Sequence, residues 1–330
     1  MEENSGQNQP GRKHTATMNF YFAPMEGLTG YIYRNAHHTF FPGIDQYFSP
    51  FIVANQCESF RTRELKDILP ENNERIVLVP QLLTNNAKDF IRASERIKSL
   101  GYDEINFNLG CPSRTVVTKK KGAGFLSETA KLDAFLDEVF SQSVTDISVK
   151  TRIGMYQPDE FYELIKIFNK YPIKELIIHP RTQKDYYENK PNLNVFKDAL
   201  ALSKNSVCYN GDIFTAKDYK EFSANFPEVE TVMIGRGLIT NPGLVSEIMN
   251  HTKIDKKLLR DFHDKIYGDY QKVLFGDRNV LFKMKELWSH MILLFTDNES
   301  YAKKIRKSQR LYEYDEAIAS LFREQELIDV

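Results

Sequence analysis

Short apolar runs alternate with longer amphipathic stretches from residue 20 to about residue 250. The apolar runs are rich in β-branched and aromatic residues and are too short for helices, so they predict buried strands. They cover residues 20–23, 44–48, 76–80, 104–108, 147–150, 176–179, 207–210 and 232–235. Eight strands that alternate with helices predict an α/β fold, the (β/α)8 TIM barrel. An open doubly wound sheet is the alternative, but it usually has fewer strands and a glycine-rich first turn, which does not follow residues 20–23.

Helical patterns occupy the intervals between these strands, and beyond about residue 250 they are the only regular pattern. The clearest cover residues 86–100, 128–140, 158–170, 216–226 and 241–249. Beyond about residue 250 the strand-like runs end, and helical patterns cover residues 255–274, 279–295, 300–311 and 314–323. We therefore predict a barrel domain at residues 18–250 and a small helical domain at residues 251–330. Residues 1–17 are rich in Asn, Gln, Gly, Ser and Thr, which predicts a disordered leader.

The composition excludes several classes of protein. The 330 residues carry 44 basic and 45 acidic side chains, a formal net charge of −1, which excludes a uniformly basic nucleic-acid-binding surface. Contacts with RNA or DNA would therefore come from a local patch. The apolar runs fall far short of the roughly 20 residues that span a bilayer, so no membrane protein is expected. No excess of apolar patches is evident, which favours a monomer.

The cysteines indicate the compartment. Cys57, Cys111 and Cys208 are too few and too scattered for a disulfide scaffold, and no pair has the spacing of zinc ligands. We therefore expect no metal site and a reducing, cytoplasmic environment. Cys57 falls in a helical stretch and Cys208 inside a predicted strand, so both are predicted to be buried structural cysteines.

Polar side chains follow most of the predicted strands at the point where each strand ends. These segments are residues 24–27, 81, 108–112, 150–152, 179–182, 210–212 and 235–237. The carboxyl ends of barrel strands meet at one mouth, where TIM-barrel enzymes place their chemistry. Charged and amide side chains directly after buried strands are costly unless they are paired or serve a ligand. The sequence therefore predicts a ligand site at this mouth.

The last two predicted strands end in residues 210–212 (Asn-Gly-Asp) and 235–237 (Gly-Arg-Gly). Small residues expose backbone N–H groups, and together with one arginine they favour phosphate binding. In barrels the loops after strands seven and eight are the usual place for a phosphate. Gln81 and Lys150 lie on strands that could reach a flat polar ring anchored by that phosphate. This combination suits flavin mononucleotide (FMN), whose reduced ring carries a negative charge that a cation stabilises.

Cys111 is the sharpest single candidate for chemistry. Gly110 precedes it and Pro112 follows it, so it is predicted to stand in a turn at the mouth. An unperturbed thiol has a pKa of about 8.5 and is mostly protonated at neutral pH, so it can donate a proton. A thiolate nucleophile is the alternative, and it needs a base or cation that lowers the pKa. His179 could serve in that way, but its place beside the phosphate segments favours cofactor binding.

In their order along the chain, these motifs resemble those of the tRNA-dihydrouridine synthases. The resemblance covers most of residues 20–310. It is carried by residues 23–27 (Ala-Pro-Met-Glu-Gly), 106–113 (Asn-Phe-Asn-Leu-Gly-Cys-Pro-Ser), 122–124 (Gly-Ala-Gly), 149–154 (Val-Lys-Thr-Arg-Ile-Gly), 179–182 (His-Pro-Arg-Thr), 210–213 (Asn-Gly-Asp-Ile) and 233–237 (Met-Ile-Gly-Arg-Gly). The chain departs from the family at Gly30, Phe107 and Pro180, and none of these positions touches the expected chemistry.

The resemblance implies an FMN-dependent reduction of uridine to 5,6-dihydrouridine in tRNA. Flavin N5 would deliver a hydride to C6 of the base, Cys111 would deliver a proton to C5, and NADPH would reduce the flavin again. The implied flavin-binding residues are Pro24, Met25, Glu26, Gln81, Lys150, His179, Asn210, Asp212, Gly235 and Arg236, of which the last four hold the phosphate end. The implied uracil contacts are Asn108, Arg152 and Tyr187.

A basic segment of the tail is the candidate RNA contact. Residues 301–310 hold five basic side chains and no acidic one. A solvated helix face is the ordinary explanation of such a run, but the resemblance favours RNA binding by Lys303, Lys304, Arg306 and Lys307. A base stacked in folded RNA must be splayed out before it can enter the mouth, at a cost of a few kcal/mol.

Two other functions fit part of the same pattern. A flavin barrel that reduces or oxidises a free pyrimidine, similar to dihydroorotate dehydrogenase, would share the barrel, FMN and a cysteine at the mouth. The helical tail and its basic segment argue against it, because a free pyrimidine needs no such platform. An RNA-binding protein whose redox role is secondary or lost is the other alternative, and the intact set of Cys111, Lys150 and Arg236 speaks against it.

Overall fold

The computed structural model describes residues 18–56 and 59–328. Within them, all strands are parallel and belong to one sheet of ten strands in the order β3-β5-β6-β7-β8-β9-β10-β1-β2-β4. Their bounds are β1 (Asn19–Phe22), β2 (Gln46–Phe48), β3 (Ile52–Val53), β4 (Leu78–Val79), β5 (Gln81–Leu83), β6 (Glu104–Leu109), β7 (Asp146–Gly154), β8 (Leu176–Thr182), β9 (Val207–Tyr209) and β10 (Thr231–Ile234).

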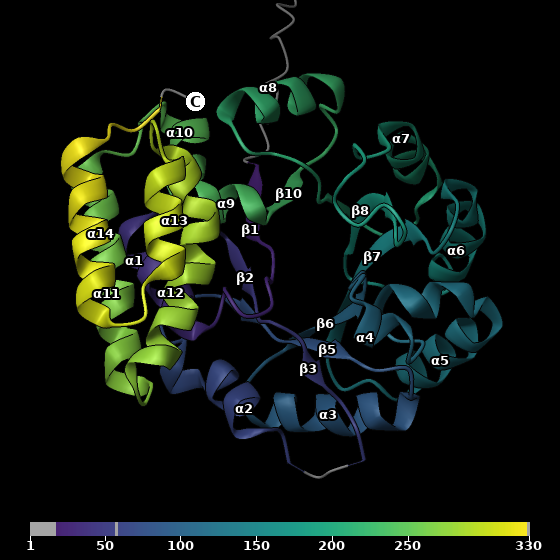
Figure 1. Ribbon diagram of the computed structural model, residues 1–330. Helices are drawn as coiled ribbons and strands as arrows, with labels where there is room; N and C mark the ends of the chain where they lie inside the picture. Colours follow the sequence, from purple (N-terminus) through teal and green to yellow (C-terminus); the bar gives the residue numbers. More distant parts are fainter. Residues whose placement is uncertain (1–17, 57–58, 329–330) are drawn as a thin grey trace, which may run out of the picture.

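The sheet closes into a barrel, seen along its axis in Figure 1. β2 pairs with β4 and β3 pairs with β5, while residues 49–51 alone separate β2 from β3 and Pro80 alone separates β4 from β5. β2 and β3 are therefore one interrupted strand, and β4 and β5 are another. Because these two strands pair with each other, the two ends of the strand order meet. Eight strands then surround the axis, which confirms the (β/α)8 barrel predicted from the sequence.

Successive residues of the strands contribute alternately to two separate apolar regions. Side chains such as Tyr21, Ile177 and Met233 form a small cluster inside the barrel. Their chain neighbours, such as Phe20 and Phe22, belong to the larger core between the strands and the helices. Cys208 lies in the inner cluster and is fully buried, as predicted, whereas Cys57 and residues 1–17 lie outside the described residues.

Helices cover the outside of the barrel. The predicted patterns correspond to α3 (Ala87–Ser99), α5 (Thr129–Gln142), η3 (Pro158–Glu160) with α6 (Phe161–Phe168), α8 (Ala216–Asn225) and α10 (Leu244–Asn250). The pattern did not reveal α1 (Tyr31–Phe40), α2 (Thr62–Ile68), η1 (Pro70–Asn72), α4 (Arg114–Val117), η2 (Gly122–Ser127), α7 (Leu193–Leu202) and α9 (Arg236–Thr240). In α1 the reason is visible, because Arg34 and His37 are buried and interrupt its apolar face.

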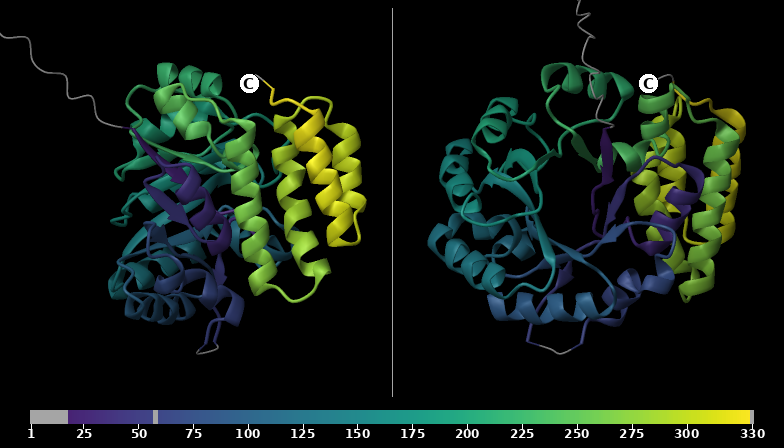
Figure 2. Two further views of the ribbon diagram at one scale, coloured as in Figure 1. Left: turned by 90° about the vertical axis from the view of Figure 1, so that its left-hand side faces the viewer. Right: turned by 180° about the vertical axis from the view of Figure 1, so that it is seen from behind.

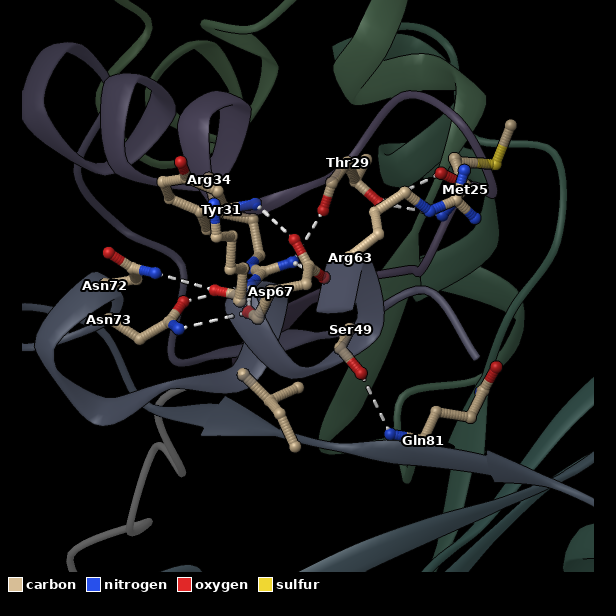
Figure 3. Close-up of polar contacts among 12 residues, drawn as sticks. Met25, Thr29, Tyr31, Arg34, Ser49, Arg63, Asp67, Asn72, Asn73 and Gln81 are labelled. Atoms are coloured by element: carbon tan, nitrogen blue, oxygen red, sulfur yellow. Dashed lines mark hydrogen bonds and ion pairs between the residues drawn. The ribbon is translucent and has the colours of Figure 1, made fainter. Parts of the chain in front are cut away.

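Arg34 pins the loop between β1 and α1 (Figure 3). Its Nη1 donates to the carbonyl of Thr29 at 2.7 Å and to Oδ2 of Asp67 at 3.0 Å, and its Nη2 donates to Oδ1 of Asn73 at 2.9 Å. Buried charges persist when they are paired and hydrogen-bonded in this way. The network holds the loop that carries residues 24–27 against α2.

The tail forms a bundle of α11 (Lys256–Val273), α12 (Asp277–Met291), η4 (Ile292–Leu294), α13 (Glu299–Lys307) and α14 (Leu311–Glu324). α11 packs on α1, where the ring of Phe262 lies 5.1 Å from that of Phe41 and 5.6 Å from that of Tyr33. The apolar core is therefore continuous from the barrel into the bundle. In Figure 2 the yellow and lime helices of the bundle stand at one end of the barrel. No helix among the described residues is long and apolar enough to cross a membrane.

Three predicted bounds need correction. β7 continues to Gly154 and β8 to Thr182, so Arg152 and Arg181 lie within strands rather than after them, and Lys150 and His179 lie inside the strands rather than at their ends. Strand ends are predicted from runs of apolar residues. Where the last side chains of a strand are polar because they face a shared polar site, the predicted strand therefore ends too early. The helical pattern of residues 300–311 is broken at residues 308–310, where Ser308 ends α13 and Arg310 precedes α14.

Candidate active site

The barrel brings the polar residues of several strands to one mouth. The strand register places Asn108 of β6 beside Lys150 of β7, and Arg152 of β7 beside His179 of β8. Gln81 begins β5, next to Asn106 of β6. The segments at residues 210–212 and 235–237 directly follow β9 and β10. The carboxyl ends of parallel neighbouring strands meet at the same end of the barrel, so the predicted grouping is present.

A chain of buried side-chain amides connects the barrel interior to the turn that carries Cys111. Asn106 Nδ2 donates to Ser148 Oγ at 3.0 Å, and Gln81 Nε2 donates to Asn106 Oδ1 at 2.7 Å. Asn108 Nδ2 donates in turn to Gln81 Oε1 at 2.7 Å. Asn108 Oδ1 accepts the backbone N–H groups of Gly110 and Cys111 at 3.0 and 2.9 Å. Each amide fixes the orientation of the next, so Asn108 positions the cysteine turn.

A glycine-containing segment, residues 122–124, packs against the turn that carries Cys111. The N–H of Ala123 donates to the carbonyl of Cys111 at 3.1 Å. Gly122 has φ +54, and a Cβ there would lie 2.9 Å from the Cys111 carbonyl oxygen. A Cβ on Gly124 would lie 2.6 Å from the carbonyl oxygen of Val117. Segment 122–124 therefore needs glycine at both ends to approach the cysteine turn so closely.

The Cys111 thiol is in its protonated form at neutral pH. Burial raises the pKa of the thiol above its ordinary value, against smaller lowering effects of the Ser113 N–H and the charges of Arg152 and Lys150. The side chain is half-buried rather than enclosed. A thiol held in this state donates a proton and is a poor thiolate nucleophile, which favours the first of its two predicted roles.

Lys150 is a cation with no acidic partner in the described part of the chain. Among the residues that the structure describes, its ammonium makes no ion pair and no hydrogen bond. Burial, helped by the nearby charge of Arg152, lowers its pKa from 10.5 to about 8. A desolvated cation at the mouth of the barrel attracts an anionic group.

Arg152 holds neighbouring segments together through hydrogen bonds to their backbone. Its Nε donates to the carbonyl of Gly110 at 3.0 Å, its Nη1 to that of Thr182 at 2.7 Å and its Nη2 to that of Tyr186 at 2.8 Å. It thereby ties the cysteine turn to the end of β8 and to the loop beyond. Arg152 also interacts with the side chain of Tyr187, so most of its five N–H groups are already engaged within the protein.

His179 is a neutral imidazole. Burial and the positive charges of Arg152, Lys150, Arg181 and Arg236 hold its pKa well below its usual range. Nε2 lies 2.9 Å from the guanidinium of Arg181, which can only donate, so the ring proton stands on Nδ1. His179 therefore offers a single N–H donor and cannot act as the base that would activate Cys111.

Asp212 holds two arginines together. Its carboxylate accepts from Arg181 Nη1 and Nη2 at 2.9 and 2.5 Å and from Arg236 Nη2 at 2.6 Å. A carboxylate repels a phosphate, so Asp212 acts on an anion only through the arginines that it orients and through its backbone. The ring of Tyr187 lies 4.4 Å from the Arg236 guanidinium carbon and 5.3 Å from that of Arg152.

The two glycine segments have no room for larger residues. A Cβ on Gly211 would lie 1.9 Å from the Tyr209 hydroxyl, and a Cβ on Gly237 would lie 2.0 Å from the Ile213 carbonyl oxygen. Asn210 Nδ2 donates to the carbonyl of Met233 at 2.8 Å and ties the two strand ends together. The backbone of both segments is thus packed so closely on neighbouring residues that only glycine fits at Gly211 and Gly237.

The loop after β1 and helix α12 border the other side of the mouth. Pro24 and Met25 are half-buried, and Glu26 is exposed and pairs with Arg63 at 2.7 Å. Lys283 of α12 donates to the carbonyl of Gly27 at 2.5 Å. The charge of Glu26 acts on the Cys111 thiol, which places this loop across the mouth from the cysteine turn. Figure 3 shows Met25 on the loop after β1 and Gln81 on β5.

Comparison with known proteins gives a consistent result. The family model described as "Dihydrouridine synthase (Dus)" matches residues 21–325. The chain belongs to the dihydrouridine synthase family. A "Probable tRNA-dihydrouridine synthase" of Staphylococcus aureus strain Mu50 is 26% identical over 262 residues, 77% of this chain and 78% of that protein. A "Probable tRNA-dihydrouridine synthase 2" of Bacillus subtilis strain 168 is 26% identical over 262 residues, 77% of this chain and 79% of that protein. Among solved structures, morphinone reductase is similar with a TM-score of 0.49 and 10% identity, covering 72% of this chain and 86% of that one.

In this member of the dihydrouridine synthase family, sequence reasoning missed two residues of the mouth. Asn106 was assigned to a buried apolar run, and only its place two residues before Asn108, on the same face of the strand, could have revealed it. Arg181 lies in the segment at residues 179–182, but its bidentate pair with Asp212 depends on the packing of β8 against β9. The tail lysines and arginine at positions 303, 304, 306 and 307 lie on α13, outside the mouth.

Proposed function

We propose that this enzyme reduces uridine to 5,6-dihydrouridine in tRNA, with FMN as its cofactor and NADPH as the reductant of the flavin. One observation carries the proposal. A protonated thiol at Cys111 and an unpaired ammonium at Lys150 share one barrel mouth in a chain of the dihydrouridine synthase family.

The residues at the mouth fit a flavin mononucleotide. The desolvated Lys150 ammonium has no acidic partner among the described residues and suits the negative charge of a reduced flavin ring. The Nδ1–H of His179 would hold the ring and the ribityl chain, with Pro24, Met25 and Glu26 beside it. Gln81 is fully buried and bonded to Asn106 and Asn108, so it would act by orienting Asn108 rather than by touching the flavin. Gly235, Arg236, Asn210 and the backbone of Asp212 would hold the phosphate end, where added Cβ atoms have no space. A bound reduced flavin would supply the hydride that C6 of the uracil needs.

The chain itself supplies the proton and the orientation of the base. Cys111 donates its proton to C5 of the uracil, because the thiol is protonated at neutral pH and its turn is fixed by Asn108. The remaining N–H groups of Arg152 face a uracil carbonyl and stabilise negative charge that develops there. Tyr187, between Arg152 and Arg236, offers a ring on which the base can pack.

The tail supports an RNA substrate over a free pyrimidine. Lys303, Lys304, Arg306 and Lys307, the α13 cations, are exposed, and none of them forms an ion pair within residues 18–56 and 59–328. Unpaired exposed cations on one short helix are free to neutralise phosphates. An enzyme that acts on a free pyrimidine has no use for them.

The test is dihydrouridine formation by the purified protein. We expect NADPH and unmodified tRNA to yield dihydrouridine in the tRNA, and we expect free uridine and free uracil to be unchanged under the same conditions. Reduction of the free pyrimidine with no change in tRNA would replace the proposal by the small-molecule alternative. A colourless protein that binds tRNA without forming dihydrouridine would support the RNA-binding alternative.

A further inference from the structure

Helix α12 exposes apolar side chains on one face. Phe282 is 65% exposed and Leu293, in η4 at its end, is 52% exposed. The opposite face of the helix is buried through Met284, Leu287 and Trp288. Phe282 of α12, the polar Ser289 and Leu293 of η4, which we call the α12 stripe, recur at helical spacing and share the solvent side. A largely exposed aromatic ring offers a partner a flat contact surface.

The α12 stripe lies between the barrel mouth and α13. On one side of it, Lys283 reaches the carbonyl of Gly27, and the charge of Arg236 acts on His290, so both residues face the mouth. On the other side, Lys285 donates to the carbonyl of Ser308 at the end of α13. Each residue advances about 100° around a helix, so position 282 lies between positions 283 and 285 on the surface. A molecule that reaches from the mouth to α13 must cross the stripe.

The charged residues around the α12 stripe indicate the chemical class of its partner. The α13 cations on the far side are exposed and unpaired within the described part of the chain, and Arg278 stands one helical turn before Phe282. Glu286 is the acidic neighbour on α12, and its Oε2 atom is buried against the loop after β1. An aromatic ring bordered by free cations fits a polyanion that also presents flat apolar faces, which is the chemistry of single-stranded nucleic acid.

We propose that the α12 stripe binds an unpaired nucleobase of the RNA substrate, with the ring of Phe282 as its stacking platform. The proposal rests on the proposed function, because it places the target nucleotide in the mouth and the flanking phosphates on α13. Stacking tolerates any base, since every base has a π face. The stripe therefore recognises an open, unstacked RNA segment rather than a sequence, and it favours RNA in which the target base is already splayed out.

The experiment measures binding of an unmodified tRNA transcript to the full chain by fluorescence anisotropy at several salt concentrations. Phe282→Ala should weaken binding roughly 5- to 100-fold, the range found for loss of one stacked base. The slope of affinity against salt should stay unchanged, because no phosphate contact is lost. Phe282→Tyr keeps the ring and should bind within about twofold of the wild type. Tyr162→Ala removes an exposed ring of α6 on the outer wall of the barrel and serves as the matched control.

Each outcome separates the inference from the proposed function. Wild-type affinity in Phe282→Ala, in a protein that forms dihydrouridine, overturns the stacking platform and leaves the proposed function standing. A wild-type dimer in light scattering that Phe282→Ala converts to a monomer assigns the stripe to a second copy of the chain and also overturns it. Absence of dihydrouridine formation by the wild type refutes the proposed function, whereas the binding series still decides whether Phe282 stacks on RNA.

Discussion

Replacement of Lys150 by methionine should stabilise the cofactor-free protein. The pKa of Lys150 falls from 10.5 to about 8 because the ammonium is desolvated and no described acidic group compensates it. A tenfold change in proton affinity corresponds to about 1.4 kcal/mol, so this lowering corresponds to a cost of up to about 3 kcal/mol at pH 7. Part of the side chain still reaches solvent, and we therefore expect Lys150→Met to gain about 1–3 kcal/mol.

The pH dependence identifies the cause of this gain. The unfolded chain binds more protons than the native protein between pH 8 and pH 10.5, so wild-type stability rises with pH through that interval. The advantage of Lys150→Met should therefore shrink by about half between pH 7 and pH 9.5. Exposed Lys197 on α7 provides the control, since Lys197→Met should change stability little at either pH.

The assay is equilibrium or thermal unfolding of cofactor-free wild type, Lys150→Met and Lys197→Met at both pH values. A variant at position 150 that is no more stable than the wild type at pH 7 would refute the idea that this ammonium is held desolvated for a ligand. A gain that is equal at the two pH values would point to packing rather than charge. The same variant should bind a reduced flavin more weakly, because the cation that attracts its negative charge is gone.

Three other changes test separate parts of the account. Arg236→Ala should lower the fraction of protein that retains FMN after gel filtration, and unchanged occupancy would remove Arg236 from the phosphate end. Neutralising the α13 cations together should weaken tRNA binding and flatten its salt dependence, and an unaltered slope would assign them to a solvated helix face. Burial raises the pKa of Glu175 from 4.5 to about 7, so the native state binds more protons and stability falls as pH rises through that interval. Glu175→Gln should remove this fall and be more stable than the wild type by about 1–3 kcal/mol at pH 8, and an unchanged stability profile would contradict the buried carboxyl.

The strands could be predicted because their signals are local, and so could the ends of β6 and β10, but not those of β7 and β8. A β-branched run followed by Gly-Cys-Pro or Gly-Arg-Gly carries its own boundary, and β6 and β10 lie where the runs placed them. The interior face of the strands gave no such signal. Asn106 and Ser148 look like interruptions of apolar runs until the barrel closes and their side chains meet across neighbouring strands.

Residues whose role depends on distant partners could not be read from the sequence. Arg34 is tolerated in α1 only because Asp67 and Asn73, more than 30 positions away, satisfy its guanidinium. Arg152 was expected to face the substrate, yet it donates hydrogen bonds to backbone carbonyls of the cysteine turn, of the end of β8 and of the loop that follows β8. The bundle meets the mouth through Lys283 and His290, and neither residue stands in a motif.

The most direct test of the central claim is dihydrouridine formation in unmodified tRNA by wild type and Cys111→Ala, each loaded with flavin and given NADPH. If the Cys111 thiol is the proton donor, the variant keeps the flavin absorbance and the tRNA affinity of the wild type and loses roughly 100- to 10,000-fold in rate. A Cys111→Ala protein that forms dihydrouridine at nearly the wild-type rate would contradict it.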